Sequence, residues 1–330
     1  MSTGNSFTLA LVTSGGEAAR DITPLVHSLS WSGSARQTAR ELSGALAIPR
    51  EGGVEIPLEE GAQLALTSPA GQLFVGPLVS VASSSLSSTV DFAALDRGRF
   101  LVGNEGWYSF SEVTPEAACA AIAADFGIPV GGLVKTGVRV SRKFPGTALD
   151  SIITSLYALA GEKNGKRYHI RFDGTGRLEA AERPAEAAFE ISRPMSVTNT
   201  WDITELQNSV AIYTDDGQLV RRIQDSQGVE RNGRLEHVLT QKNGEDAEES
   251  ARAWLEDHGL SQSLTAELFP GNTELRTGGA VRLRDAGSGV SGLFWIESDT
   301  HTWKNGLLFT KLGLSFRQLA QDKTAGEEIS

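Results

Sequence analysis

The sequence of 330 residues predicts an α+β fold that is mainly β and contains two small β domains of one kind. Three observations carry this prediction. One spacing of glycines and apolar residues occurs twice, some 200 residues apart. The regions around both copies alternate between apolar and polar residues, as half-buried strands do. Residues 111–190, between them, carry the capping signals and apolar stripes of helices instead.

The repeated spacing consists of a turn glycine, an alternating strand, a glycine-rich hairpin and a second strand. The first copy spans residues 58–79 and the second spans 275–295. We expect Gly61 to superpose on Gly278, Leu64 on Val281, Leu66 on Leu283 and Gly76 on Gly292. The two glycine spacings are 15 and 14 residues, so the extra residue is predicted in the first hairpin. Glycine-punctuated hairpins are common, and a chance match is the alternative.

Residues 7–100 carry almost only strand signals, with one ambiguous stretch. Ser34 could cap a helix over residues 35–42, because serine accepts hydrogen bonds from free backbone N–H groups. Leu42, Gly44 and Leu46 alternate instead as a strand would. Both alternatives stay open at this level.

The middle region predicts two helices and a hairpin. Thr114 with Pro115 and Glu116 is a typical helix start, and Gly127 ends that helix. A second helix is predicted from Thr147, with Asp150 as its capping partner, to Gly161. A hairpin over residues 168–179 completes a compact α+β module.

The last region returns to β structure around one predicted helix, 246–259, which begins at Asp246 and ends at Gly259. Val210–Tyr213 reads as a strand before this helix, so the second β domain is expected to draw strands from both sides of it. The predicted domains are a first β domain at 1–110, an α+β domain at 111–190, a second β domain at 191–320 and a disordered acidic tail at 321–330.

Composition excludes several classes of protein. Net charge is −11, from 30 basic and 41 acidic residues, which argues against a DNA-coating surface. No apolar run approaches 18 residues, so no membrane span is expected. The N-terminal residues lack a signal-peptide pattern, and the single cysteine, Cys119, fits a small buried residue among alanines. We therefore expect folding in the cytoplasm.

The sequence predicts no catalytic, cofactor-binding or metal site. The five histidines lack metal-ligand spacing, and no nucleophile-elbow motif occurs. His301 is the one histidine with both a nearby carboxylate and nearby hydroxyls, so it is the weak catalytic candidate. Residues 161–166 imitate a phosphate loop but leave a helix rather than enter one. The acidic pairs Glu59/Glu60, Asp215/Asp216 and Glu248/Glu249 read as solvated charge in turns or on helix surfaces.

Several segments together resemble XkdQ-type phage tail proteins, the baseplate hub proteins of contractile tails and related particles. The opening, Leu29-Ser30-Trp31-Ser32-Gly33 followed by Arg40-Glu41-Leu42, is similar, although Ser34 stands where the family has an acidic residue. Similar segments follow at 114–118, 126–129, 148–153, 167–178 and 275–298, then at His301 and the final strand. The resemblance spans about residues 20–318 and favours a loop plus strand over residues 34–48.

The resemblance implies a structural protein without enzymatic activity. It implies a homotrimer with two tube-like β-barrel domains per chain, so that three chains form a pseudo-sixfold ring between a sixfold tail tube and a threefold central spike. The implied partners are the tube protein, the spike protein and baseplate wedge or other tail proteins, with DNA passing through the channel without specific binding. The implied location is the virion tail baseplate, assembled in the bacterial host cytoplasm. A tail-associated cell-wall hydrolase, a ligand-binding β protein of such assemblies and a secretion-system spike component are the alternatives.

Overall fold

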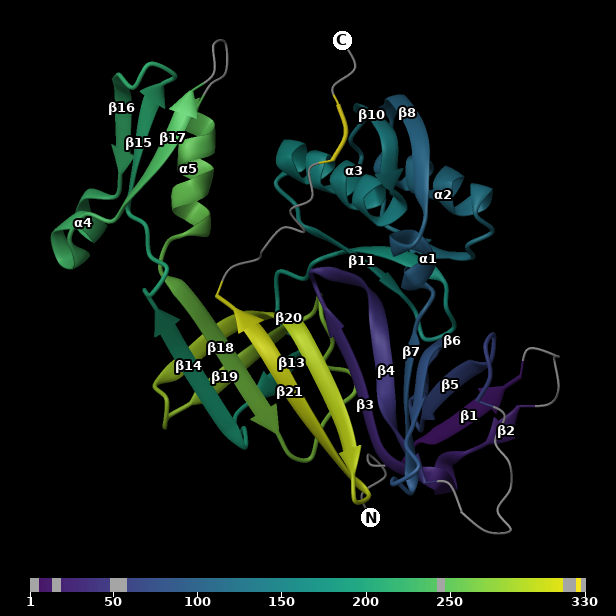
Figure 1. Cartoon of the computed structure of the whole chain (residues 1–330). Coiled ribbons are helices and arrows are strands. Elements are labelled where there is room, and N and C mark those ends of the chain that lie inside the picture. Colours follow the sequence, from purple (N-terminus) through teal and green to yellow (C-terminus); the bar gives the residue numbers. More distant parts are fainter. Residues whose placement is uncertain (1–5, 14–18, 48–57, 242–246, 317–324, 328–330) are drawn as a thin grey trace. The chain divides into compact units, whose positions relative to one another are not determined.

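A computed structural model describes residues 6–13, 19–47, 58–241, 247–316 and 325–327 (Figure 1). The chain divides into two compact units. The first comprises Met1–Val197 together with Thr265–Ser330, and the second comprises Thr198–Leu264. Strands dominate the described residues, which confirms a mainly β fold.

The N-terminal strands form the first repeat. A one-turn helix, η1 (Thr23–Leu25), precedes its central strands. In the sheet the neighbouring strands follow the order β3-β4-β7-β6-β5-β1-β2. The strands are β1 (Thr8–Val12), β2 (Arg20–Asp21), β3 (Val26–Ser34), β4 (Gln37–Ala47), β5 (Gln63–Ser68), β6 (Gly71–Ser83) and β7 (Thr89–Leu95). A two-residue turn between β3 and β4 settles the ambiguity over residues 34–47 in favour of strands, and Ile48 lies outside the described residues.

The C-terminal strands form a second repeat with the same order. The order β14-β18-β21-β20-β19 matches β3-β4-β7-β6-β5 strand for strand, both along the chain and across the sheet. The difference at the open end is β13, which pairs parallel to β19, whereas β1 pairs antiparallel to β5. The strands are β13 (Phe189–Ile191), β14 (Ser196–Asp202), β18 (Ser261–Leu268), β19 (Ala280–Asp285), β20 (Val290–Lys304) and β21 (Leu307–Ser315).

Backbone details confirm the duplication residue by residue. Gly61 and Gly278 have φ angles of 86° and 88°, a left-handed conformation that favours glycine. In the first repeat, Ala62 N–H donates to Glu59 O, and Leu78 N–H donates to Ala62 O. In the second repeat, Gly279 N–H donates to Arg276 O and Ile296 N–H donates to Gly279 O. Leu64 and Val281, predicted to be equivalent, are both fully buried.

The second strand of each hairpin departs from the predicted alignment. Leu64 pairs with Gly76, whereas Val281 pairs with Phe294, so the structural equivalent of Gly76 is Phe294 and not Gly292. The extra residue therefore lies in the second hairpin, opposite to the prediction. The reason is that the turn of the first hairpin has two residues, between Ser68 and Gly71, whereas the turn of the second has four, between Asp285 and Val290. A bulge next to Leu66 adds one residue back to the first hairpin, which leaves a net difference of one. Gly76 and Gly292 are close in sequence spacing but face different partners.

The two repeats share one sheet. Strand β3 pairs with β20 over seven residue pairs, from Ser28↔Lys304 to Ser34↔Ser298 (Figure 1). Trp303 and Leu308 of the second repeat pack in the same apolar cluster as Trp31, Leu42 and Leu64 of the first. Among the described residues the resulting 13-stranded sheet stays open, and no sheet closes into a barrel. The two closed barrels expected from the sequence are thus replaced by two repeats joined edge to edge.

The middle α+β module lies within the first unit. Its helices and strands enclose a core that includes Ile122, Phe144, Ile153 and Leu156. The hairpin β11–β12 pairs as predicted, and β9 joins it in parallel. The elements are α1 (Gly98–Val102), β8 (Glu105–Val113), α2 (Pro115–Asp125), β9 (Val130–Leu133), β10 (Val140–Ala148), α3 (Leu149–Asn164), β11 (Tyr168–Phe172) and β12 (Leu178–Glu182).

Both predicted helices of this module exist, but the second begins and ends later than predicted. Helix α2 begins after Thr114, and Gly127, just past its end, has φ +62°. The predicted start of the second helix at Thr147 is wrong, because Thr147 belongs to strand β10 and α3 begins two residues later. Gly161 lies buried inside α3, and Gly165, with φ +73°, ends it. A buried glycine that packs closely looks like a terminator in sequence alone.

The second unit shows that the insertion is larger than one helix. It contains a three-stranded sheet of order β16-β15-β17, covered by α5, whose residues Ala251 and Trp254 pack on Val210 and Ile212. The predicted strand at Val210–Tyr213 belongs to this sheet and not to the second repeat. Asp246 lies outside the described residues. The elements are β15 (Ser209–Thr214), β16 (Leu219–Gln224), α4 (Ser226–Asn232), β17 (Glu236–Gln241) and α5 (Ala247–Asp257).

Part of the predicted tail contacts the α+β module. Glu327 and Lys143 exchange two backbone hydrogen bonds, and the Arg142 guanidinium donates to the carbonyl oxygens of Ala325 and Gly326. Residues 325–327 therefore extend the edge of β10, while the rest of the tail lies outside the described residues. In the described part of the chain, no helix is both long enough and apolar enough to cross a membrane.

Candidate functional site at the seam of the two repeats

The site centres on the seam, which we define as the paired segments Ser28–Ser34 of β3 and Ser298–Lys304 of β20. Each repeat supplies one strand, so the polar side chains on these strands meet only when the two repeats are joined. Asp299 pairs across the seam with Gly33, and His301 pairs with Trp31. The small Gly33 leaves room for the long side chain of Arg40, which lies directly over it.

Asp299 is the most heavily bonded side chain of the seam. Arg40 Nη1 donates to Asp299 Oδ1 at 3.0 Å, and Nη2 forms an ion pair with Oδ2. Thr277 donates its backbone N–H at 2.6 Å and its hydroxyl at 2.7 Å to Asp299 Oδ1. Burial opposes ionisation of Asp299, but the Arg40 charge and the hydrogen bonds outweigh it and hold the pKa well below its usual range. The carboxylate therefore stays charged and ties both repeats to the 275–279 turn.

His301, the weak catalytic candidate, lies fully buried beneath this ion pair. Its Nε2 is 3.1 Å from Asp299 Oδ2, its Nδ1 is 3.0 Å from Thr310 Oγ1, and its ring stacks on Trp31 at 5.1 Å. Burial lowers the pKa of His301 despite the neighbouring carboxylate, which favours the neutral imidazole. The residue types Thr310, His301 and Asp299 match a nucleophile, base and orienting acid. All three are sealed from solvent, so the arrangement serves packing and offers no substrate access.

Two arginines lie over the ring of the seam tryptophan. The Arg40 guanidinium carbon lies 4.2 Å from the centre of the Trp31 ring, and that of Arg276 lies 5.1 Å away. The Arg276 Nε–H also donates to Thr273 O at 2.8 Å. Stacking of arginine on tryptophan is favourable when water is excluded. The two arginines thus connect the Asp299 network on the seam strands to the turn that precedes β19.

The α+β module is attached to the same seam. Arg183 Nη1, at the end of this module, donates to Glu297 Oε1 of β20 at 2.6 Å, and the Arg183 side chain is fully buried. The ring of His169 lies against Gly278, where a Cβ atom would overlap it. Burial, together with repulsion from Arg183, Arg171 and Arg40, lowers the pKa of His169 to about 3. A neutral His169 therefore packs against the turn at Gly278, which is equivalent to the turn at Gly61 in the first repeat.

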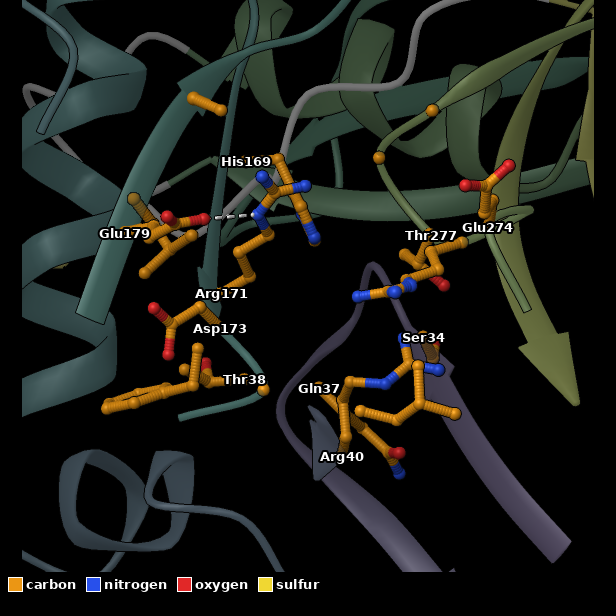
Figure 2. A pocket seen from close by; sticks show the side chains of 18 of the residues that line it. Ser34, Gln37, Thr38, Arg40, His169, Arg171, Asp173, Glu179, Glu274 and Thr277 are labelled. Atoms are coloured by element: carbon orange, nitrogen blue, oxygen red, sulfur yellow. Dashed lines mark hydrogen bonds and ion pairs between the residues drawn. The ribbon is translucent and has the colours of Figure 1, made fainter. Parts of the chain in front are cut away.

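A pocket of about 670 Å³ opens beside this network (Figure 2). Figure 2 shows side chains from three parts of the chain around it: Gln37 and Arg40 from the first repeat, His169 and Arg171 from the hairpin β11–β12, and Thr277 from the second repeat. Arg171 Nε donates to Glu179 at 2.9 Å, so this charge is partly neutralised. Both basic and acidic groups line the wall, which suits a polar joint between three segments better than a site for one kind of charged ligand.

The other sequence candidates lie away from the seam. Cys119 is buried in α2, and burial raises the pKa of its thiol to about 12, so it is not a reactive nucleophile. Residues 161–166 form the end of α3 and the turn after it. The acidic pairs occupy exposed turns or the first turn of α5. Across the described residues, no group of three or more potential metal ligands occurs.

Sequence reasoning missed the seam itself. Arg40 and Asp299 are 259 residues apart, and nothing in either local pattern links them. The available signal is that both residues are charged and lie in segments where apolar and polar residues alternate, as they do in half-buried strands. A charge at such a position requires a partner if it is buried.

Comparison with known proteins agrees with this architecture. A family model described as YqbQ-like matches residues 29–315. The Phage-like element PBSX protein XkdQ of Bacillus subtilis (strain 168) is 24% identical over 233 residues, covering 66% of this chain and 70% of the relative. The 43 kDa tail protein of prophage MuSo2 from Shewanella oneidensis has a TM-score of 0.67 at 13% identity and covers 96% of this chain and 99% of its own.

A tail protein from Neisseria meningitidis MC58 has the same TM-score, 0.67, at 14% identity, with 97% of this chain and 99% of that chain covered. At such identities the structural likeness shows a common fold. The family model covers most of the chain: the first repeat from Leu29 of β3 onward, the α+β module and the second repeat up to Ser315. The chain therefore belongs to the YqbQ-like family.

Proposed function

We propose that this chain is a structural protein of a phage or phage-like contractile tail. In this proposal it is the baseplate hub: three copies form a ring that joins the sixfold tail tube to the threefold central spike. The relative XkdQ is named as part of a phage-like element, and the two structures with the highest similarity quoted above are tail proteins. These names place relatives in tails, and the internal duplication of this chain supports the hub role.

The single observation that carries the proposal is the strand-for-strand match between the two repeats. Three chains with two repeats each present six similar units, so a threefold assembly can meet a sixfold tube. The tube-like barrels expected from the sequence become, in this proposal, neighbouring segments of one tube wall. We also propose the domain boundaries expected from the sequence, at residues 110, 190 and 320.

The proposed partners are the tube protein, the spike protein and wedge or other baseplate proteins, in the virion tail after assembly in the host cytoplasm. DNA would pass through the channel without specific binding, which fits a chain of net charge −11. A hydrolase gains no support from the seam, because His301 and Thr310 are buried. The proposal therefore assigns the chain no enzymatic role.

Negative-stain microscopy of the chain coexpressed with tube and spike proteins tests the proposal. We expect a ring of this chain between the tube and the spike, and no joining of tube to spike when the chain is omitted. Tubes that bind the spike equally well without this chain would overturn the hub role.

A further inference from the structure

We propose that the open edge of β6, Leu78–Ser83, receives strand β14 of a second copy of this chain. The β3–β20 seam within the chain would then be repeated between chains. This inference rests on the proposed ring, and it names the surface through which neighbouring copies join.

The equivalence of strands leads to this pairing. In the matched orders β3-β4-β7-β6-β5 and β14-β18-β21-β20-β19, β14 holds the place of β3 and β20 holds the place of β6. Within one chain, β3 of the first repeat pairs with β20 of the second. The same joint, moved by one repeat, pairs β14 of one copy with β6 of the next.

The edge of β6 that would accept a strand is open, whereas the equivalent edge of β20 is paired with β3. Strand β20 pairs with β21 on one side and, from Ser298 onward, with β3 on the other. Strand β6 pairs with β7 from Leu78 to Ser83, and no other described strand pairs with that segment. Both strands carry the same irregularity, between Leu78 and Ser80 in β6 and between Ile296 and Ser298 in β20, which aligns the two edges residue by residue.

A groove of about 730 Å³ runs along this edge, lined in part by Pro77–Val81 and Phe100. Val79, Val81 and Phe100 are 39%, 42% and 43% exposed. In the second repeat the matching position is closed, because Ala35 N–H donates to Glu297 O at 2.8 Å, and Glu297 is the equivalent of Val79. Exposed apolar side chains beside an unpaired strand edge are a ready site for strand addition.

The donor edge, on β14, pairs with β18 and with no other described strand. Strand β14 ends the strand order of the 13-stranded sheet, and its residues are exposed except for the half-buried Val197. Trp201 of β14 is 66% exposed. A joint between β14 and β6 uses different surfaces on the two copies, so it is head-to-tail and closes into a ring when the rotation per chain divides a full turn. Three copies joined in this way give six repeats in series.

A proline substitution tests the acceptor edge. The Glu297 carbonyl faces β3, and strand residues alternate in direction, so Asp299 also faces β3 and its equivalent, Val81, faces the open edge. Val81→Pro removes an N–H group from that edge and leaves the β7 pairing intact. We expect Val81→Pro to keep the wild-type unfolding midpoint within a few degrees but to lose the ring, whereas the control Val81→Thr retains it. Intact rings of folded Val81→Pro protein would overturn the assignment.

Cysteine cross-linking tests the pairing directly in tail particles that contain the chain. One cysteine replaces Val81, and a second replaces each residue from Thr198 to Asp202 in turn, because disulfides form only between Cα atoms within about 7 Å. We expect covalent trimers on mild oxidation with at least one of these pairs. The control places the first cysteine at Gln72, on the end of β6 that pairs with β5.

The outcomes separate this inference from the proposed function. Covalent trimers with cysteine at Val81 and none with cysteine at Gln72 support the pairing. A three-copy ring in which none of the pairs cross-links overturns the pairing but leaves the hub role intact. Absence of any ring of the wild-type chain in the particle overturns both.

Discussion

Arg40 of the first repeat and Asp299 of the second, 259 residues apart, form a buried two-point ion pair across the seam. This pair joins the duplicated halves, with the Arg40 guanidinium over the Trp31 ring and Thr277 bonded to Asp299. The seam is therefore both the main connection within the chain and, in our proposal, the pattern for the connection between chains.

Removing the arginine should destabilise the chain strongly. Arg40→Ala leaves Asp299 buried without its cation, which typically costs about 3–5 kcal/mol in the free energy of unfolding. Urea unfolding at pH 7 measures the change. The control is Arg171→Ala, which removes a partly exposed ion pair with Glu179 and should cost under about 1 kcal/mol. Equal losses for the two variants would contradict the central role of the seam pair.

The sequence predicted those parts of the fold that depend on local chemistry. Gly61 and Gly278 could be matched because both need a left-handed backbone, and Pro115 after Thr114 marked a helix start. Gly76 was misaligned because cross-strand register depends on the length of the hairpin turn and on a bulge, and these differ between the two repeats. The Arg40–Asp299 pair could not be predicted, because it exists only once two distant repeats share a sheet.

Acid should weaken the folded state through His169. Its pKa is about 3 in the folded chain, against about 6.5 for an unperturbed histidine. The unfolded chain therefore binds a proton between these pH values that the folded chain does not, and the free energy of unfolding falls as the pH is lowered through this window. One such group contributes about 1.4 kcal/mol per pH unit. We expect His169→Gln to reduce the slope of the unfolding free energy against pH, between pH 6 and pH 4, by an amount that corresponds to about one bound proton. An unchanged slope, measured by urea unfolding, would contradict the neutral burial of His169.

The turn of the second repeat at Gly278 should not tolerate a side chain. Its φ of +88° is strained for other residues, and a Cβ atom would also overlap the His169 ring. Gly217→Ala is a matched control, since Gly217 has φ +83° with no heavy atom within 4 Å of the added Cβ. We expect Gly217→Ala to cost about 1–2 kcal/mol and Gly278→Ala to cost more. If thermal unfolding shows equal losses, the contact with His169 does not constrain the turn.

The equivalent core positions should respond alike. Leu64→Ala and Val281→Ala each remove a fully buried apolar side chain, and we expect losses of about 2–4 kcal/mol. Leu86→Ala, at a residue that is 92% exposed, should change the free energy of unfolding by less than about 0.5 kcal/mol. A loss at only one of the two buried positions would show that the repeats are equivalent in shape but not in energetics.

The assembled ring should not bind DNA. Three chains of net charge −11 give about −33 per ring, and so acidic an assembly repels the phosphate groups of DNA. A gel-shift assay with duplex DNA at low salt should show no complex. A salt-sensitive complex would contradict a channel through which DNA passes without binding.

The most direct measurement is a reconstruction of the tail end of a particle that contains this chain. The account predicts three copies per ring, with the first repeat (β3–β7) and the second repeat (β14 and β18–β21) alternating around the channel as six similar units and the seam recurring between copies. Six copies per ring, or repeats that do not occupy matching places around the axis, would contradict it.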